Sequence, residues 1–409
     1  MGRAYKAKVT LYSLFFNKMR RKTHEVRVGK VGIGGDNPVR VQSMTNTSTM
    51  DTEACVAQIL RIVEAGGEIV RLTTQGTREA ENMGVIRRRL RELGCDVPLV
   101  ADVHFNPAVA MVAARHCEKV RINPGNFTDA ARQFKQLEYT DEEYAAELQK
   151  IEDRLVPLLD VCREHGTALR IGVNHGSLSD RIMSRYGDTP EGIVESCMEF
   201  LRICLRHNFD QVVISVKASN VVVMTESMRL LVKAMDREGM TFPLHLGVTE
   251  AGEGEDGRIK SAVGIGALLT EGIGDTIRVS LSEAPENEIP VAFAILQAAR
   301  LRITKTEYIS CPGCGRTLYD LEGTIRRIKE AIAAASAASP ELAHRLSGLK
   351  IAIMGCIVNG PGEMADADYG YVGAARGKVS LYRRRELVER NVPQEEAVDH
   401  LLALIKADR

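Results

Sequence analysis

The sequence predicts a (β/α)₈ barrel followed by a smaller α+β domain, and three observations carry this prediction. Between residues 39 and 281, short β-branched segments alternate with longer amphipathic ones, which is the pattern of βαβ units around a parallel sheet. Eight such units occur, the number that closes a barrel. After residue 303 the repeat stops, and cysteines and Gly-Pro turns become prominent.

Each predicted strand of the barrel ends in polar residues. The eight strands are expected at 39–44, 68–73, 98–104, 119–125, 168–175, 211–217, 243–250 and 276–281. The segment 52–67 shows the intervening helical pattern, because its apolar residues recur at three- and four-residue spacings before a glycine. A doubly wound open sheet is the alternative, but it would need a glycine-rich dinucleotide loop after the first strand, and none follows residue 44.

We therefore expect three parts, namely an N-terminal extension at 1–30, the barrel at 31–303 and the small domain at 304–409. The small domain is predicted to begin with a linker at 304–310. Its remaining elements are expected to be a helix at 318–339, a strand at 349–355, strands at 369–375 and 378–384, and a helix at 393–407.

Composition and charge exclude several classes of protein. Apolar residues make up 44% of the 409 residues, and Lys+Arg and Asp+Glu both number 54, so the formal net charge is zero. Nucleic acid and anionic membranes are therefore disfavoured as partners, and no apolar run reaches the roughly 20 residues that span a bilayer. The nine cysteines, an odd and mostly scattered set, predict a reducing compartment and hence a cytoplasmic protein.

Cationic residues recur within the predicted strands, although an unpaired buried cation is costly. The five that come from different strands are Arg71, Arg121, Arg170, Lys217 and Arg278. Because the carboxyl ends of barrel strands converge on one mouth, we expect these side chains to meet there. Such an excess of positive charge predicts a phosphate or diphosphate ligand.

Alternation along the strands assigns further polar residues to the same faces. Asn174 shares a face with Arg170, and Ser280 shares one with Arg278. The carboxylates expected at the mouth are Asp102, Glu250 and Asp275. Two alternatives remain open: each arginine could simply pair with a carboxylate at the rim, or the histidines at 104, 175 and 245 could hold a metal ion.

Three cysteines of the small domain form a candidate metal centre. Cys311 and Cys314 make a C-x-x-C pair in a Pro-Gly turn, and Cys356 follows a predicted strand and enters a Gly-Pro-Gly loop. Three thiolates alone complete neither an iron–sulfur cube nor a structural zinc site. Glu363, at the far end of the same loop, is the candidate fourth ligand. A zinc knuckle and a redox dithiol are the alternatives.

The chain from about residue 31 to its C-terminus resembles the 4-hydroxy-3-methylbut-2-en-1-yl diphosphate synthase family of the non-mevalonate isoprenoid route. Ten motifs in order carry the resemblance: VQSMTNT, EIVRLT, ADVHFN, RINPGN, RIGVNHGS, SVKAS, HLGVTEAG, GIGDTIRVSL, SCPGCGRT and GCIVNGPGE. The insertion domain of longer members is absent, which predicts the two-domain bacterial form.

The resemblance implies a substrate, a cofactor and partners. It implies two-electron reductive ring opening of 2-C-methyl-D-erythritol 2,4-cyclodiphosphate to 4-hydroxy-3-methylbut-2-enyl diphosphate with loss of water. It implies a [4Fe–4S] cluster on Cys311, Cys314, Cys356 and Glu363, reduced by ferredoxin or flavodoxin, in a homodimer whose chains complete each other's sites. On this basis we expect Glu250 to be the proton donor and Asn359 to hydrogen-bond the group at the fourth cluster position.

Overall fold

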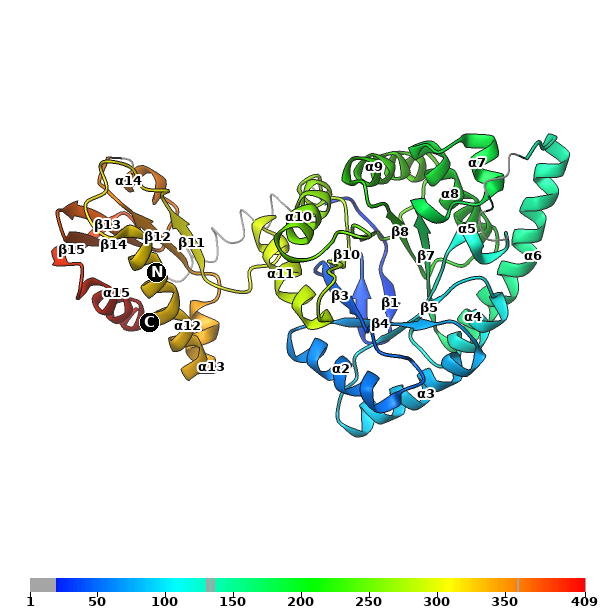
Figure 1. Ribbon diagram of the computed structural model, residues 1–409, viewed down its shortest axis with the longest axis horizontal. Helices are drawn as coiled ribbons and strands as arrows, with labels where there is room; N and C mark the ends of the chain where they lie inside the picture. Colours follow the sequence, from blue (N-terminus) through cyan, green and yellow to red (C-terminus); the bar gives the residue numbers. More distant parts are fainter. Residues whose placement is uncertain (1–19, 130–132, 134–136, 359, 409) are drawn as a thin grey trace. The chain divides into compact units, whose positions relative to one another are not determined.

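The computed structural model describes residues 20–129, 133, 137–358 and 360–408. The chain divides between Arg302 and Ile303 into two units, each considered by itself (Figure 1). The elements of the first unit are blue to yellow-green in Figure 1, and those of the second are yellow to red. Among the described residues, no helix is long and apolar enough to cross a membrane.

The first unit contains one sheet of eight parallel strands in the order β8-β7-β6-β5-β4-β3-β10-β9. The strands are β3 (Arg40–Met44), β4 (Ile69–Thr74), β5 (Leu99–Val103), β6 (Lys119–Ile122), β7 (Ala168–Asn174), β8 (Val212–Lys217), β9 (His245–Leu246) and β10 (Thr276–Ile277). A parallel bridge from Ile214 to Leu244 joins β8 to the segment before β9. The predicted (β/α)₈ barrel is confirmed, with β9 and β10 shorter than expected.

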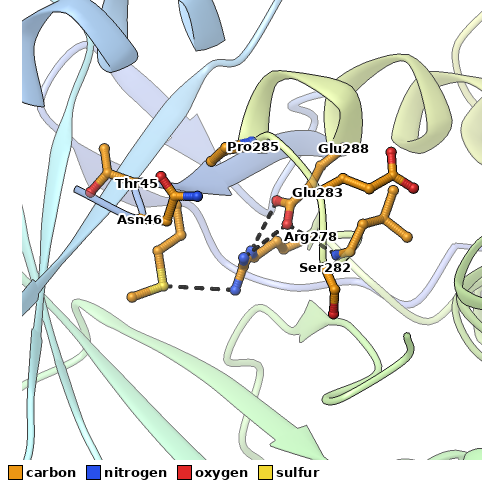
Figure 2. Close-up of a pocket in the computed structure, with 9 residues that line it drawn as sticks. Thr45, Asn46, Arg278, Ser282, Glu283, Pro285 and Glu288 are labelled. Atoms are coloured by element: carbon orange, nitrogen blue, oxygen red, sulfur yellow. Dashed lines mark hydrogen bonds and ion pairs between the residues drawn. The ribbon is translucent and has the colours of Figure 1, made fainter. Parts of the chain in front are cut away.

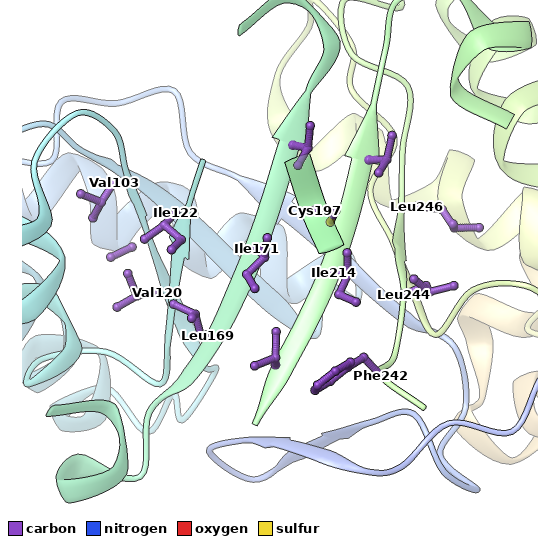
Figure 3. Close-up of a cluster of buried hydrophobic side chains, with 14 of the residues drawn as sticks. Val103, Val120, Ile122, Leu169, Ile171, Cys197, Ile214, Phe242, Leu244 and Leu246 are labelled. Carbon is purple, nitrogen blue, oxygen red and sulfur yellow. The ribbon is translucent and has the colours of Figure 1, made fainter. Parts of the chain in front are cut away.

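Helices alternate with the strands and surround the sheet (Figure 1). They are α2 (Thr52–Glu64), α3 (Thr77–Glu92), α4 (Pro107–Ala114), α5 (Pro124–Phe127), α6 (Asp141–His165), α7 (Asp180–Tyr186), α8 (Pro190–Arg206), α9 (Val221–Arg237), α10 (Gly254–Thr270) and α11 (Glu288–Ala298). Two short 3₁₀ turns, η1 (His175–Ser177) and η2 (Pro285–Asn287), follow β7 and β10. The main core lies between strands and helices, where Ile171, Ile214 and Cys197 are fully buried (Figure 3).

A hairpin covers the amino-terminal end of the barrel. Its antiparallel strands are β1 (Val26–Val28) and β2 (Val31–Ile33). Their buried side chains pack on residues at the starts of β4, β5, β7 and β8, such as Val100 and Ala168. The barrel boundary expected at residue 31 therefore falls inside this hairpin. The valines of β1 precede residue 31 and are buried against the barrel strands. Residues 1–19 lie outside the described part of the chain.

The second unit is a five-stranded sheet with helices. Its strands are β11 (Glu307–Ser310), β12 (Lys350–Met354), β13 (Tyr369–Ala375), β14 (Lys378–Arg383) and β15 (Glu386–Pro393), in that spatial order. Its helices are α12 (Leu321–Ala338), α13 (Pro340–Leu346), α14 (Gly360–Glu363) and α15 (Ala397–Ala407). The first three strands are parallel and the last three antiparallel.

Two strands of this sheet are not apparent in the sequence. The linker predicted at 304–310 is wrong over Glu307–Ser310, which pairs in parallel with β12. β15 has a largely exposed pattern with two glutamates and an arginine. Both are edge strands with one neighbour each, so they need less apolar surface than a central strand and give a weak sequence signal.

Candidate functional site

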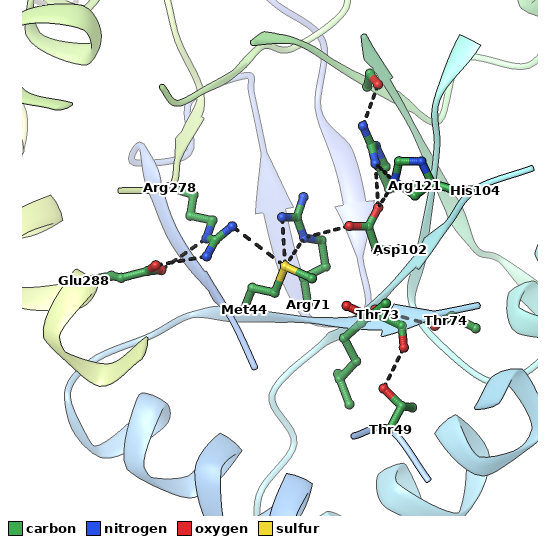
Figure 4. A network of polar contacts seen from close by, with 12 residues as sticks. Met44, Thr49, Arg71, Thr73, Thr74, Asp102, His104, Arg121, Arg278 and Glu288 are labelled. Atoms are coloured by element: carbon green, nitrogen blue, oxygen red, sulfur yellow. Dashed lines mark hydrogen bonds and ion pairs between the residues drawn. The ribbon is translucent and has the colours of Figure 1, made fainter. Parts of the chain in front are cut away.

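The strand register brings the predicted cations of the barrel together. Arg121 on β6 is directly opposite both Asp102 on β5 and Arg170 on β7. Arg71 and Lys217 are buried on β4 and β8. Figure 4 shows Arg71, Asp102 and Arg121 converging from neighbouring strands. The structure therefore gathers the predicted cationic set inside the barrel.

Asp102 is the carboxylate that two of these arginines share. Its Oδ1 accepts a hydrogen bond of 2.8 Å from Arg121 Nη1, and its Oδ2 lies 3.5 Å from Arg71 Nε. Burial alone would raise the pKa of Asp102, but Arg71, Arg121 and Arg170 outweigh it and hold that pKa well below its usual range. Burial lowers the pKa of Arg71 to about 10, against the opposing effect of Asp102. Asp102 is therefore a fixed negative charge, already engaged by protein cations.

Arg170 and Lys217 are different because no carboxylate among the described residues forms a hydrogen bond or an ion pair with either of them. Arg170 is 1% exposed, and its Nε and Nη1 have no hydrogen-bond partner among the described residues. Burial and the neighbouring arginines lower the pKa of Lys217 well below its usual value. A guanidinium remains charged in proteins, so Arg170 is a buried cation with unused donors. This arrangement favours an anionic ligand.

Arg278, which follows β10, lines a cavity. The cavity has a volume of about 480 Å³ and is lined by Met44, Thr45, Asn46, Arg278, Leu281, Ser282, Glu283, Pro285 and Glu288 (Figure 2). Arg278 forms two hydrogen bonds with the carboxylate of Glu288, of 3.1 and 2.9 Å. The sulfur of Met44 accepts from Arg71 Nη2 at 2.9 Å and lies 3.7 Å from Arg278 Nη1.

Sequence reasoning missed Glu288 and Met44. Glu288 opens α11, ten residues after Arg278, so strand alternation says nothing about it. Met44 was available from the pattern, because it ends β3 opposite Arg71. Methionine sulfur is only a weak acceptor, however, and the sequence offered no reason to single it out.

Of the other predicted mouth residues, Asn174 ends β7 and Ser280 follows β10; both are partly exposed. Glu250 does not end a strand, because β9 stops at Leu246; it is exposed, in a loop, with a φ of 54°. Asp275 is not at the mouth. It precedes β10 and accepts a hydrogen bond of 2.6 Å from Arg20, because it lies at the amino-terminal end of that strand.

Lys119 and His104 lie beside these arginines; Lys119 was not predicted, and His104 was considered only as a possible metal ligand. Lys119, two residues before Arg121 on β6, is fully buried, and its Nζ has no partner among the described residues. Burial and Arg121 lower the pKa of His104 to about 4, so its imidazole is neutral near pH 7. His104 lies against Arg121 Nη1, and its Nδ1 is 3.1 Å from Asn126 Nδ2.

In the second unit, the three predicted cysteine ligands follow the ends of two adjacent parallel strands. Ser310 on β11 is paired with Ile353 on β12, so Cys311 and Cys356 both lie just beyond the carboxyl ends of these two strands. The backbone N–H of Gly355 donates to Cys311 Sγ at 3.1 Å. Cys314 is exposed, and hydrogen bonds from Arg316 lower the pKa of its thiol.

These residues fit an iron–sulfur group in their chemistry. Thiolates bind such clusters, and backbone N–H donors to the sulfurs tune them. A Cβ at Gly355 would lie 2.8 Å from Thr317 Oγ1, so the close packing of these two residues favours glycine. Glu363 is exposed at the end of α14. Asn359 lies outside the described residues, and no group of three or more His, Cys, Asp or Glu within the described part is close enough to hold one metal ion.

Comparison with known families covers nearly the whole chain. The GcpE TIM-barrel domain matches residues 23–293, and the GcpE protein C-terminal domain matches residues 307–407. The chain belongs to the GcpE family. The first match begins before residue 31, as the β1–β2 hairpin requires.

Curated relatives of this GcpE chain bear one name with two electron donors. A 4-hydroxy-3-methylbut-2-en-1-yl diphosphate synthase (ferredoxin) from Parasynechococcus marenigrum is 54% identical, covering 95% of each chain. The corresponding flavodoxin enzyme from Bacteroides thetaiotaomicron is 46% identical, covering 96% of this chain and 99% of the relative. That alignment spans 616 residues, so the Bacteroides relative contains residues that this 409-residue chain lacks.

Proposed function

We propose that this chain is an iron–sulfur oxidoreductase that opens the ring of 2-C-methyl-D-erythritol 2,4-cyclodiphosphate. The products are 4-hydroxy-3-methylbut-2-enyl diphosphate and water, and the reaction consumes two electrons together with protons. The observation that carries the proposal is the cationic interior of the barrel, where Arg170 keeps unused donors and Asp102 is already engaged. A diphosphate supplies the missing negative charge, and its oxygens suit the forked donors of arginine.

We assign the binding of this substrate to the mouth of the barrel. The residues that would hold the ring are Arg71, Asp102, Arg121, Arg170, Asn174, Lys217, Arg278 and Ser280. The five cations would engage the diphosphate, and Asp102 and Asn174 would orient the hydroxyl groups. Glu250, which is exposed in the loop after β9, would deliver a proton to the departing oxygen. Asn359 would hydrogen-bond the group at the cluster.

We further propose a [4Fe–4S] cluster held by Cys311, Cys314, Cys356 and Glu363, which supplies the two electrons when bound. Reduced ferredoxin or flavodoxin would recharge it, as the names of the relatives suggest. The barrel has cationic side chains that would bind an anion, and the second unit has the thiols that would bind the cluster. The expected assembly is therefore a homodimer in which two chains complete each other's sites. A cytoplasmic location fits six buried or partly buried free thiols in the barrel.

The test is anaerobic purification followed by iron and sulfide analysis. We expect about four irons and four acid-labile sulfides per chain, as a cubane cluster contains. Replacing Cys311, Cys314 or Cys356 by serine should abolish the cluster and the reductive activity. Stoichiometric zinc without labile sulfide would overturn the proposal and favour a barrel enzyme that acts on a phosphate ester and has a structural zinc site.

A further inference from the structure

Glu288 is a buried carboxylate whose two oxygens are both fully engaged. The residue is 2% exposed. Its Oε1 accepts from Arg278 Nη2 at 2.9 Å and from the backbone N–H of Leu281 at 3.2 Å. Its Oε2 accepts from Arg278 Nε at 3.1 Å and from Ser43 Oγ at 2.7 Å. Four donor groups from three residues therefore fix the orientation of this carboxylate.

The consequence falls on Arg278. A carboxylate that binds Nε and Nη2 together holds one edge of the planar guanidinium, which sets the direction of the other edge. That other edge carries Nη1, whose neighbour is the sulfur of Met44 at 3.7 Å, beside the cavity (Figures 2 and 4). A thioether accepts hydrogen bonds weakly, so a phosphate oxygen would replace it readily.

We propose that Glu288 is a positioning residue for substrate, which holds Arg278 with its Nη1 edge directed toward the bound diphosphate. The inference rests on the proposed function, because it requires Arg278 to contact the diphosphate. Glu288 acts through Arg278, since both of its oxygens are occupied by protein donors. Ser43, on β3, has its Oγ 2.7 Å from Oε2 of Glu288 and 3.1 Å from the carbonyl oxygen of Pro285, so its proton is directed to the nearer carboxylate.

Charge and orientation predict opposite effects when Glu288 is neutralised. A carboxylate near an anion site repels the anion, so on charge alone Glu288→Gln would tighten binding of the diphosphate. If orientation dominates, the variant should bind the cyclic substrate more weakly. Glutamine has only one accepting oxygen, so Arg278 loses one of its two hydrogen bonds to residue 288 and is no longer held in one orientation. Inorganic pyrophosphate, which is flexible and unconstrained by a ring, should be less sensitive to orientation. The two ligands together therefore separate the two effects.

The experiment uses the full chain carrying its metal cluster, kept anaerobic, with dissociation constants measured by calorimetry and KM and kcat by turnover. We expect Glu288→Gln to raise both the Kd and the KM of the cyclic diphosphate at least about tenfold, the cost of losing one charge-assisted contact. Binding of pyrophosphate should weaken by less than threefold or become tighter. The matched control is Glu286→Gln. Glu286 lies two residues before Glu288, and its carboxylate pairs with Arg61 instead of Arg278, so this change should leave both constants unchanged.

Three further variants make the result decisive. Arg278→Lys should weaken substrate binding, and the double variant Arg278→Lys, Glu288→Gln should bind no worse, because the two residues act as one unit. Unchanged substrate affinity in Arg278→Lys would refute the proposal that Arg278 contacts the diphosphate. Weakened binding in Arg278→Lys with normal binding in Glu288→Gln, or additive effects in the double variant, would refute only the positioning role. If Glu288→Gln does not fold, Ser43→Ala should raise the Kd two- to fivefold, and an unchanged Kd would overturn the inference.

Discussion

Replacing Asp102 by asparagine should destabilise the barrel strongly. Asparagine keeps the size of the side chain but removes the charge that Arg71 and Arg121 share. The three side chains are nearly buried, at 9% exposed for Asp102, 9% for Arg71 and 4% for Arg121. The change therefore leaves cations in a buried site with no compensating carboxylate between them.

The magnitude follows from the geometry. Breaking a buried ion pair by removing one partner costs about 3–5 kcal/mol. Here the amide oxygen of asparagine can still accept from Arg121, which also donates to the carbonyl of Gly172 at 2.8 Å. We therefore expect the lower end, a loss of about 3 kcal/mol in the free energy of unfolding.

Urea unfolding of the cluster-free full chain measures this quantity at pH 7. The control is Asp160→Asn, a surface residue 64% exposed that pairs with Arg163, and its effect should stay within about 0.5 kcal/mol. Saturating inorganic pyrophosphate should stabilise the Asp102→Asn variant, since a bound anion stabilises the folded state by mass action. A loss below about 1 kcal/mol for Asp102→Asn would refute the view that this carboxylate balances the buried arginines.

Three further predictions concern binding, proton transfer and pH. The double variant Arg121→Ala, Arg170→Ala should lose at least about a hundredfold in kcat/KM, because each charge-assisted contact contributes about 1.5–3 kcal/mol. Normal kinetics would contradict the proposal that these arginines bind the diphosphate. Glu250→Gln should bind substrate and retain its cluster but lose about a hundredfold or more in turnover; near-normal turnover with weakened binding would identify a structural partner instead. The pKa of His104 is about 4 in the folded chain and 6.5 in the unfolded one, so its neutral form contributes stability above pH 6.5 that is lost as the pH falls toward 4. His104→Gln should flatten that part of the urea-stability profile, and an unchanged profile would assign the pH dependence to other groups.

The sequence by itself determined the barrel and most of its inward cations, Lys119 being the one that was missed. Both follow from local rules, because strand alternation fixes which residues share a face whatever the rest of the chain does. Arg71, Arg121 and Arg170 were found in this way, and the register of the strands places Arg121 directly beside Arg170, whereas Arg71 is opposite Val100 and reaches the cluster through Asp102. The spacing of Cys311 and Cys314 likewise indicated a candidate metal-binding turn without reference to the fold.

Tertiary structure alone decided which groups each cation meets. Glu288 reaches Arg278 only because η2 and α11 turn back onto β3 and β10, and no periodicity links two residues on different kinds of element. The same holds for Asp275, which strand pattern placed at the mouth but whose partner, Arg20, lies more than 250 residues away in sequence. Local sequence fixes the face on which a side chain lies, whereas its partner depends on how distant segments pack.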